Sequence, residues 1–230
     1  MELKTKAIVL KSAVSGDKDV LVTLFCIDYG IIKAKLRSAK GEKAKLKFAK
    51  EQFCFADFVI AEKNGFYTII QADVIDTFYS LVSNYDAFMK GSEIFKIVLK
   101  VLYQNQANNP LFISVLKSIK TLAYDRVQPN VVLAKFLLEL FFSEGYLFSH
   151  STCSNCNQKL GADVYLDFDS GEVLCFSCKT PYSQRVTHEL SGILKVISAT
   201  NYDNLHTLTF DEFNLENVVL LLSRVFEKKF

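Results

Sequence analysis

The chain has 230 residues, of which 50% are hydrophobic, and a formal net charge of +2. This length and composition allow a substantial core in one large domain or two smaller ones, and they exclude a disordered chain. Lysine and glutamate interrupt the most apolar stretch, 131–148, and no apolar signal segment follows Met1. We therefore expect a cytoplasmic protein with no membrane partner.

Five short strands are expected in the first 80 residues, where valine, isoleucine, phenylalanine and threonine are frequent. Turn signals separate them at Gly16, Gly30 and Asn64-Gly65. Five short strands favour a small β-barrel of the OB-fold type, although an SH3-like barrel has a similar number of strands. The expected strands span 5–11, 20–27, 31–36, 52–61 and 66–74.

The hydrophobic pattern takes on a helical period after Ser80. Asn109-Pro110 and Pro129 mark two helix starts, because proline is favoured in the first helical turn. The third helix is apolar nearly all round, so we expect it to be the buried centre of a helical bundle and to end at Gly145. The expected helices span 85–104, 109–125, 131–144, 189–199 and 214–228.

Four cysteines form two Cys-x2-Cys pairs that enclose 18 residues. This spacing is typical of a structural zinc site, in which each short turn directs two thiolates at one ion. The intervening segment predicts a hairpin with its turn at 169–171, which would bring the second pair back to the first. We expect one structural zinc ion held by Cys153, Cys156, Cys175 and Cys178.

Other roles fit the cysteines less well. Disulfides are not expected without a secretory signal, and a thioredoxin-type redox pair does not need a second matching pair. Four thiolates leave no open position for a catalytic water, and the His-x-Glu motif of zinc deaminases is missing because Glu189 directly follows His188. We expect Cys26 and Cys54 to be buried in strands and His150 to lie at the surface.

Positive charge is concentrated in residues 33–50, which contain eight basic residues and one acid, Glu42. The rest of the chain has a net charge of −5, so the pattern indicates a local site for a polyanion. A solvated strand edge protected by lysines is the competing interpretation. The predicted nucleic-acid-binding residues are Lys33, Lys35, Arg37, Lys40, Lys43, Lys45, Lys47 and Lys50.

Strand periodicity places the basic residues of 31–37 on one face, and 43–48 repeats the alternation. The two stretches are expected to form a cationic strip beside Phe48, Phe53 and Phe55. Phosphates would follow the lysines while bases stack on the aromatic rings. Lysine lacks the planar fork with which arginine reads guanine, so the strip predicts binding that tolerates many sequences.

Four features occur in order along the chain: Thr-Lys-Ala-Ile-Val-Leu-Lys at 5–11, Gly-Asp-Lys-Asp-Val-Leu-Val-Thr-Leu-Phe at 16–25, Tyr29-Gly30 before the basic stretch, and Gln-Ala-Asp-Val-Ile-Asp-Thr-Phe at 71–78. Gly145-Tyr146 and the two cysteine pairs follow them. In this combination the chain resembles the bacterial recombination and repair family RecO over nearly its whole length.

The resemblance implies an α+β multidomain protein. It implies an OB-fold barrel at 1–80, an α-helical domain at 81–148 and 187–230, and a zinc-finger insertion at 149–186. It also implies binding of single- and double-stranded DNA, annealing of complementary strands, and cooperation with RecR in loading RecA onto DNA coated by single-stranded DNA-binding protein. The implied partners are DNA, RecR, the acidic tail of single-stranded DNA-binding protein and, indirectly, RecA and RecF, in the nucleoid region of the cytoplasm.

No enzyme motif is found: the phosphate-binding Gly-x4-Gly-Lys-Ser/Thr, a nucleophile motif and a two-metal acidic cluster are all missing from the sequence. We therefore expect a protein without enzymatic activity. The alternatives are a zinc-ribbon adaptor whose basic strip contacts an acidic protein, and a nucleic-acid enzyme that lacks familiar motifs.

Overall fold

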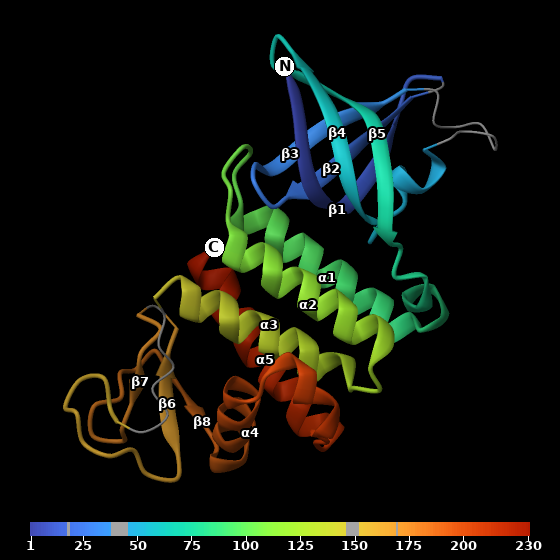
Figure 1. The fold of residues 1–230 in the computed structure, drawn as a ribbon. Helices are drawn as coiled ribbons and strands as arrows, with labels where there is room; N and C mark the ends of the chain where they lie inside the picture. Colours follow the sequence, from blue (N-terminus) through green and yellow to red (C-terminus); the bar gives the residue numbers. More distant parts are fainter. Residues whose placement is uncertain (18, 38–45, 146–151, 169) are drawn as a thin grey trace. The chain divides into compact units, whose positions relative to one another are not determined.

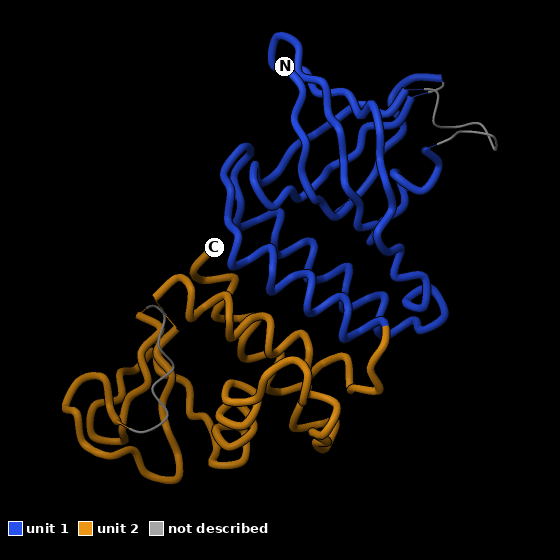
Figure 2. The backbone as a smooth tube through the Cα atoms, in the orientation of Figure 1, with its two compact units in different colours: residues 1–123 blue, residues 124–230 orange. Residues whose placement is uncertain are grey.

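A computed structural model describes the chain except for residues 18, 38–45, 146–151 and 169. The described residues form two compact units, 1–123 and 124–230, which are coloured separately in Figure 2. The division into a barrel, a helical domain and a zinc insertion stays a prediction.

The first unit begins with five strands that form a closed barrel in the order β1-β2-β3-β5-β4 (Figure 1). The β3 and β5 pair is parallel, and the other neighbouring strands are antiparallel. This arrangement confirms the predicted OB-fold over the SH3-like alternative. The strands are β1 (Glu2–Ser15), β2 (Asp19–Cys26), β3 (Gly30–Leu36), β4 (Phe55–Lys63) and β5 (Phe66–Asp76).

Apolar side chains from alternate strand positions fill the barrel, among them Leu24, Ile32 and Phe58. Cys26 and Cys54 are buried in this core, as predicted, but only Cys26 lies in a strand, because Cys54 directly precedes β4. Burial, together with the charge of nearby acids, raises the pKa of Cys26 to about 12 and that of Cys54 to about 11. Both thiols are therefore neutral at physiological pH and behave as small apolar side chains.

Two short 3-10 helices, η1 (Lys47–Lys50) and η2 (Tyr79–Ser83), and two long helices, α1 (Tyr85–Val101) and α2 (Asn109–Tyr124), complete this unit. The Asn84 side chain caps α1 by accepting a hydrogen bond of 3.1 Å from a backbone N–H.

The barrel packs on α1 and α2 through aromatic side chains. Phe53 lies between Phe88 and Phe95, with ring centroids 5.4 and 4.9 Å away, and Phe25 contacts Phe112 at 5.2 Å. These contacts bury the part of the barrel that faces α1 and α2, which lie beside the strand ends in Figure 1. That part is therefore closed to solvent and to ligands.

The second unit is built around α3 (Pro129–Ser143), which is buried nearly all round, as predicted. Within the unit α3 packs against α4 (His188–Ala199), η3 (Tyr202–Thr207) and α5 (Glu212–Lys229). Among the helices of the described residues, none is long and apolar enough to cross a lipid bilayer.

A small antiparallel sheet of order β7-β6-β8 precedes α4 in the chain. The predicted hairpin is confirmed as β6 (Val164–Asp167) and β7 (Val173–Leu174). The third strand, β8 (Ser183–Val186), was not predicted from the sequence because its four residues carry no clear alternation.

Candidate metal centre and nucleic-acid interface

The first cysteine pair lies on a tight turn that precedes β6. The Cys153 N–H donates to the Gln158 carbonyl over 2.8 Å, and the Asn157 N–H donates back to the Cys153 carbonyl over 2.9 Å. Asn157 has a positive φ of 57°, a conformation that asparagine adopts more readily than most residues. These bonds fix the turn so that its two thiols point the same way.

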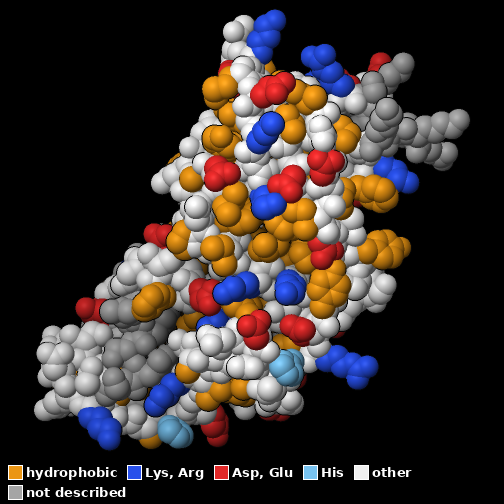
Figure 3. Space-filling view, in the orientation of Figure 1, with side chains coloured by type: hydrophobic (Ala, Val, Ile, Leu, Met, Phe, Trp, Pro, Cys, Tyr) orange, Lys and Arg blue, Asp and Glu red, His pale blue; other side chains and the backbone are white. Residues whose placement is uncertain are grey.

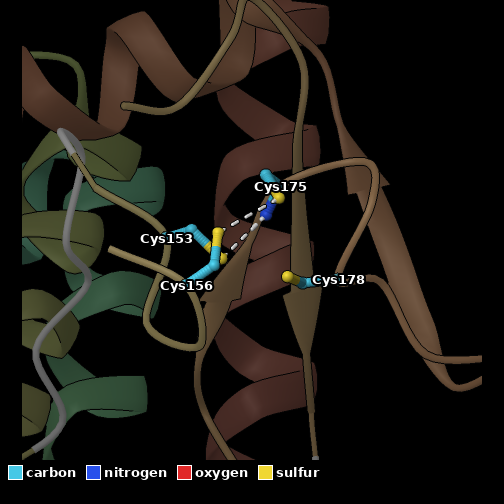
Figure 4. A group of neighbouring side chains, drawn as sticks. All are labelled: Cys153, Cys156, Cys175 and Cys178. Carbon is cyan, nitrogen blue, oxygen red and sulfur yellow. Dashed lines mark hydrogen bonds between the residues drawn. The ribbon is translucent and has the colours of Figure 1, made fainter. Parts of the chain in front are cut away.

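The second pair follows β7 directly, on a turn in which the Cys178 N–H donates to the Cys175 carbonyl over 3.1 Å. Pairing of β7 with β6 brings this turn beside the first one, as predicted. Figure 4 shows the four side chains converging from the two turns.

The cluster has the dimensions of a tetrahedral metal site. All four sulfurs lie within 4.8 Å of one another, and the Cys156 and Cys175 sulfurs are 3.8 Å apart. A tetrahedron with Zn–S bonds of about 2.3 Å places its sulfurs about 3.8 Å apart. The four cysteines can therefore hold a metal ion with only small shifts of their side chains.

Backbone donors prepare the cluster for a cation. Burial opposes ionisation of Cys153, but the N–H groups of Cys156, Cys175 and Asn155 donate to its sulfur and lower its pKa to about 6. The pKa of Cys178 is raised to about 12 because the neighbouring sulfurs share its thiol proton. Such shared protons are the ones that a bound metal ion displaces.

Asp167 links the hairpin to the segment that follows the second cysteine pair. Its buried carboxylate accepts a hydrogen bond from the Ser170 N–H at 3.0 Å and from the Thr180 hydroxyl at 2.7 Å. A short polar network thus holds the end of the hairpin against the segment that follows Cys178. This role was not predicted from the sequence.

On the barrel, β3 presents the predicted basic face. Ile32, Ala34 and Leu36 are buried, whereas Lys33 and Arg37 are exposed. Lys35 is also on the basic face, where it forms an ion pair of 2.8 Å with Asp19 of β2. Part of the Lys35 charge is therefore already balanced by Asp19, and the role of Lys33, Lys35 and Arg37 in binding phosphates stays a prediction.

The pairing register adds a basic residue that sequence reasoning missed. Lys11 of β1 lies opposite Thr23 of β2, and Thr23 lies opposite Lys33 of β3. The two lysines therefore stand in one row across three neighbouring strands, about 10 Å apart. Lys11 was not found because its position depends on how the strands pair, which its local sequence does not indicate.

The second predicted basic strand is wrong in the part that the structure describes. Residues 47–50 form the 3-10 helix η1, so Lys47 and Phe48 are neighbours on a helical turn. Lys40, Lys43 and Lys45 lie outside the described residues.

The predicted aromatic contacts are also corrected in part. Phe53 is 2% exposed and Phe55 is 9% exposed, because the helices of the same unit cover that side of the barrel. Neither ring can stack on a base. Phe48 is 47% exposed, so the predicted stacking of a base on its ring stays a prediction.

Charge on the remaining barrel surface is mixed. Over β4 and β5, acidic and basic side chains lie among apolar ones (Figure 3). Lys6 of β1 forms an ion pair of 2.9 Å with Asp57 of β4 on the same surface. This side of the barrel therefore presents no continuous positive potential to a phosphate chain.

Comparisons with known proteins agree with this architecture. The family described as "Recombination protein O N terminal" matches residues 1–78, and "Recombination protein O C terminal" matches residues 82–228. The chain is 28% identical to a "DNA repair protein RecO" of Clostridium novyi over 98% of this chain and 90% of that protein.

Two further relatives carry the same name. The protein of Caldanaerobacter subterraneus is 30% identical over 76% of this chain and 71% of its own length. The protein of Acetivibrio thermocellus is 24% identical over 99% of this chain and 91% of its own length. The similarity thus extends over both the barrel and the helical region.

Proposed function

The chain belongs to the RecO family of DNA repair and recombination proteins, and from this premise we propose that it binds single- and double-stranded DNA and anneals complementary strands. The family consists of non-enzymatic recombination mediators. The observation that carries the proposal is the group of exposed basic side chains on one barrel face, here called the basic row: Lys11 and Lys33 lie side by side across β1, β2 and β3, and Arg37 directly follows β3.

Charge neutralisation is the proposed mechanism of annealing. Two DNA strands repel one another, and lysines that neutralise their phosphates lower this repulsion and release counterions. Contacts to phosphates leave the base edges free to pair. Lys11 and Lys33 supply point charges, and the single arginine of the row, Arg37, does not provide the planar base recognition that a row of arginines would.

The barrel core holds the strands of the basic row in a fixed position. Ile32, Ala34 and Leu36 anchor β3 in the barrel core, so Lys33 projects from a strand that pairs with β2 along its length and with β5 at Ala34 and Lys35. Lys11 and Lys33 therefore hold a fixed spacing across β1, β2 and β3, and Arg37 directly follows the end of β3. Phosphates of an extended DNA strand can be met in succession along such a row.

We further propose that the four-cysteine cluster holds one structural zinc ion, with Cys153, Cys156, Cys175 and Cys178 as its ligands. The spacing of the sulfurs supports this assignment. Four thiolates complete the tetrahedron, so the ion would supply cross-linking of the two turns and no open position for chemistry.

The proposed partners follow from the family. They are RecR, the acidic tail of single-stranded DNA-binding protein and, indirectly, RecA and RecF, with the protein acting on DNA at the nucleoid in the cytoplasm. In this role the bound protein and RecR would help RecA to displace single-stranded DNA-binding protein. The DNA contact is the step to test first, because the others depend on it.

A charge-reversal experiment tests that contact. Lys11, Lys33 and Arg37 are changed together to glutamate, and binding of a mixed-sequence single strand and of a duplex is measured by fluorescence anisotropy. The expected result is a loss of affinity of at least about tenfold for both DNAs, because several phosphate contacts are removed. Annealing of complementary strands should slow in parallel.

A matched control changes the same amount of charge elsewhere. Lys4, Lys63 and Lys117 are exposed and lie outside the basic row, so their joint replacement by glutamate should leave most of the affinity intact. Equal loss in both variants would show that only net charge matters. Unchanged DNA affinity in the first variant, with loss of binding to an acidic protein, would favour the adaptor alternative.

A further inference from the structure

A groove of about 640 Å³ lies between η1 and the η2 to α1 region of the first unit. Its volume is in the range of pockets that bind small organic molecules. Phe48 of η1 and Tyr79 of η2 line it and are 47% and 73% exposed. Two aromatic rings are thus available to a ligand in the same groove.

The groove also carries positive charge. Lys47 and Lys50 line it, and the Lys47 ammonium lies 4.8 Å from the centre of the Phe48 ring. Among the described residues of the lining, Glu51 is the one carboxylate. The combination of cations and aromatic rings suits a ligand that has both a negative charge and a flat π-face.

Two residues of the lining have unusual backbone conformations. Phe53 and Phe78 are buried and have φ angles of 74° and 48°, in the left-handed region that bulky residues rarely adopt. Such conformations cost free energy and cluster at ligand-binding sites. The Phe78 N–H is held by the Asp76 carboxylate at 2.8 Å, which stabilises the turn that presents Tyr79.

From these observations we propose that the groove binds an unpaired nucleobase of single-stranded DNA, stacked on Phe48 and Tyr79, with the flanking phosphates at Lys47 and Lys50. The inference rests on the proposed DNA binding and adds to it a site that distinguishes single strands from duplexes. A paired base has both faces covered by its neighbours in the stack, so only an unpaired base can enter. The charge of the lining favours this occupant over a neutral peptide.

The test compares two single strands that share the same phosphate chain. One is an oligothymidylate of about 16 nucleotides, within the range of OB-fold site sizes, and the other has the same length with every base removed. The wild-type protein is expected to bind the oligothymidylate more tightly. Phe48→Ala and Tyr79→Ala should each weaken that binding by roughly 5- to 150-fold while leaving the abasic strand unaffected.

Matched controls exclude a general effect of removing an exposed ring. Phe66 and Tyr103 are both 78% exposed and lie outside the groove, so Phe66→Ala and Tyr103→Ala should bind both strands like the wild type. Phe48→Leu keeps an apolar side chain without a π-face and should also lose preference for the strand with bases. All variants are checked for folding by circular dichroism.

The outcomes separate this inference from the proposed function. Equal binding of both strands by the wild type would overturn the base site and leave the phosphate contacts intact. Failure to bind either strand would remove the proposed function itself. Base-independent DNA binding, together with capture of an acidic peptide that the Phe48 and Tyr79 variants lose, would assign the groove to a protein segment and overturn the inference.

Discussion

The zinc proposal predicts that the two cysteine turns and the sheet of β6, β7 and β8, together called the finger, lose their structure when a single ligand is removed. Cys156 is the most exposed of the four cysteines, so Cys156→Ser removes a thiolate without leaving a buried cavity. Structural zinc sites bind with apparent free energies of about 10–16 kcal/mol. This is comparable to the total stability of a typical domain, about 5–15 kcal/mol.

The finger has few other sources of stability. Its small sheet buries Val164, Leu166, Val173, Leu174 and Val186. Folded units of fewer than about 40 residues usually need a metal ion, a disulfide or a partner chain. We therefore expect the sheet of β6, β7 and β8 to unfold locally in the Cys156→Ser variant, while the barrel stays folded.

Metal analysis and hydrogen exchange measure the two halves of this prediction. The wild type should contain one zinc ion per chain, and the variant should contain far less. Amides of β6 and β8 should exchange faster in the variant or after chelation, and amides of the barrel strands should not change. Cys54→Ala, which removes a buried thiol of the barrel, is the matched control and should keep its zinc. Full zinc content and unchanged exchange in Cys156→Ser would refute the reasoning.

Three further predictions concern stability. Gly30→Ala should lower the free energy of unfolding by more than about 2 kcal/mol, because φ is +67° and the new Cβ would lie 2.0 Å from the Gln106 carbonyl oxygen. Gly65 also has a positive φ, +79°, but has open space around it. In the same urea titration Gly65→Ala should therefore show only the smaller loss of stability that comes from the strained backbone. Burial raises the pKa of Cys26 from 9.0 to about 12, so the folded state keeps a proton that the unfolded state loses. Stability should therefore fall as pH rises above about 9, by up to about 1.4 kcal/mol per pH unit, and Cys26→Ala should lose less than the wild type over that window in paired urea titrations. Lys135→Met should lower the free energy of unfolding by about 1 kcal/mol, because the buried ammonium donates a hydrogen bond of 3.1 Å to the Ser198 carbonyl. Lys135→Ala should lower it further, because the volume of the aliphatic part of the side chain is also lost. Equal losses for the two variants in thermal unfolding would contradict this.

Elements with a strong period were predictable from the sequence. The alternation of Ile32, Ala34 and Leu36 with basic residues follows from a strand that has one face in a barrel core. The two cysteine pairs were predictable for a similar reason, because a Cys-x2-Cys turn and a hairpin of suitable length determine where the thiols meet.

The parts that were not predicted depend on long-range packing. Phe53 and Phe55 are aromatic and follow the basic stretch closely in sequence, which favoured an exposed stacking surface. Helices distant in sequence cover both rings. Lys11 joins the basic row only through the pairing of β1 with β2. The alternation at 43–48 predicted a strand, but residues 47–50 form a 3-10 helix. A run of only a few residues is too short to distinguish the period of a strand from that of a helix.

The most direct test of DNA binding by the barrel is the salt dependence of affinity for a single strand. The logarithm of the association constant falls with the logarithm of salt concentration by about 0.7 for each phosphate that the protein neutralises. If Lys11, Lys33 and Arg37 each contact one phosphate, the slope of their joint glutamate variant should be shallower than that of the wild type by about 2. Identical slopes for the two proteins, or wild-type affinity that does not change with salt, would contradict the account.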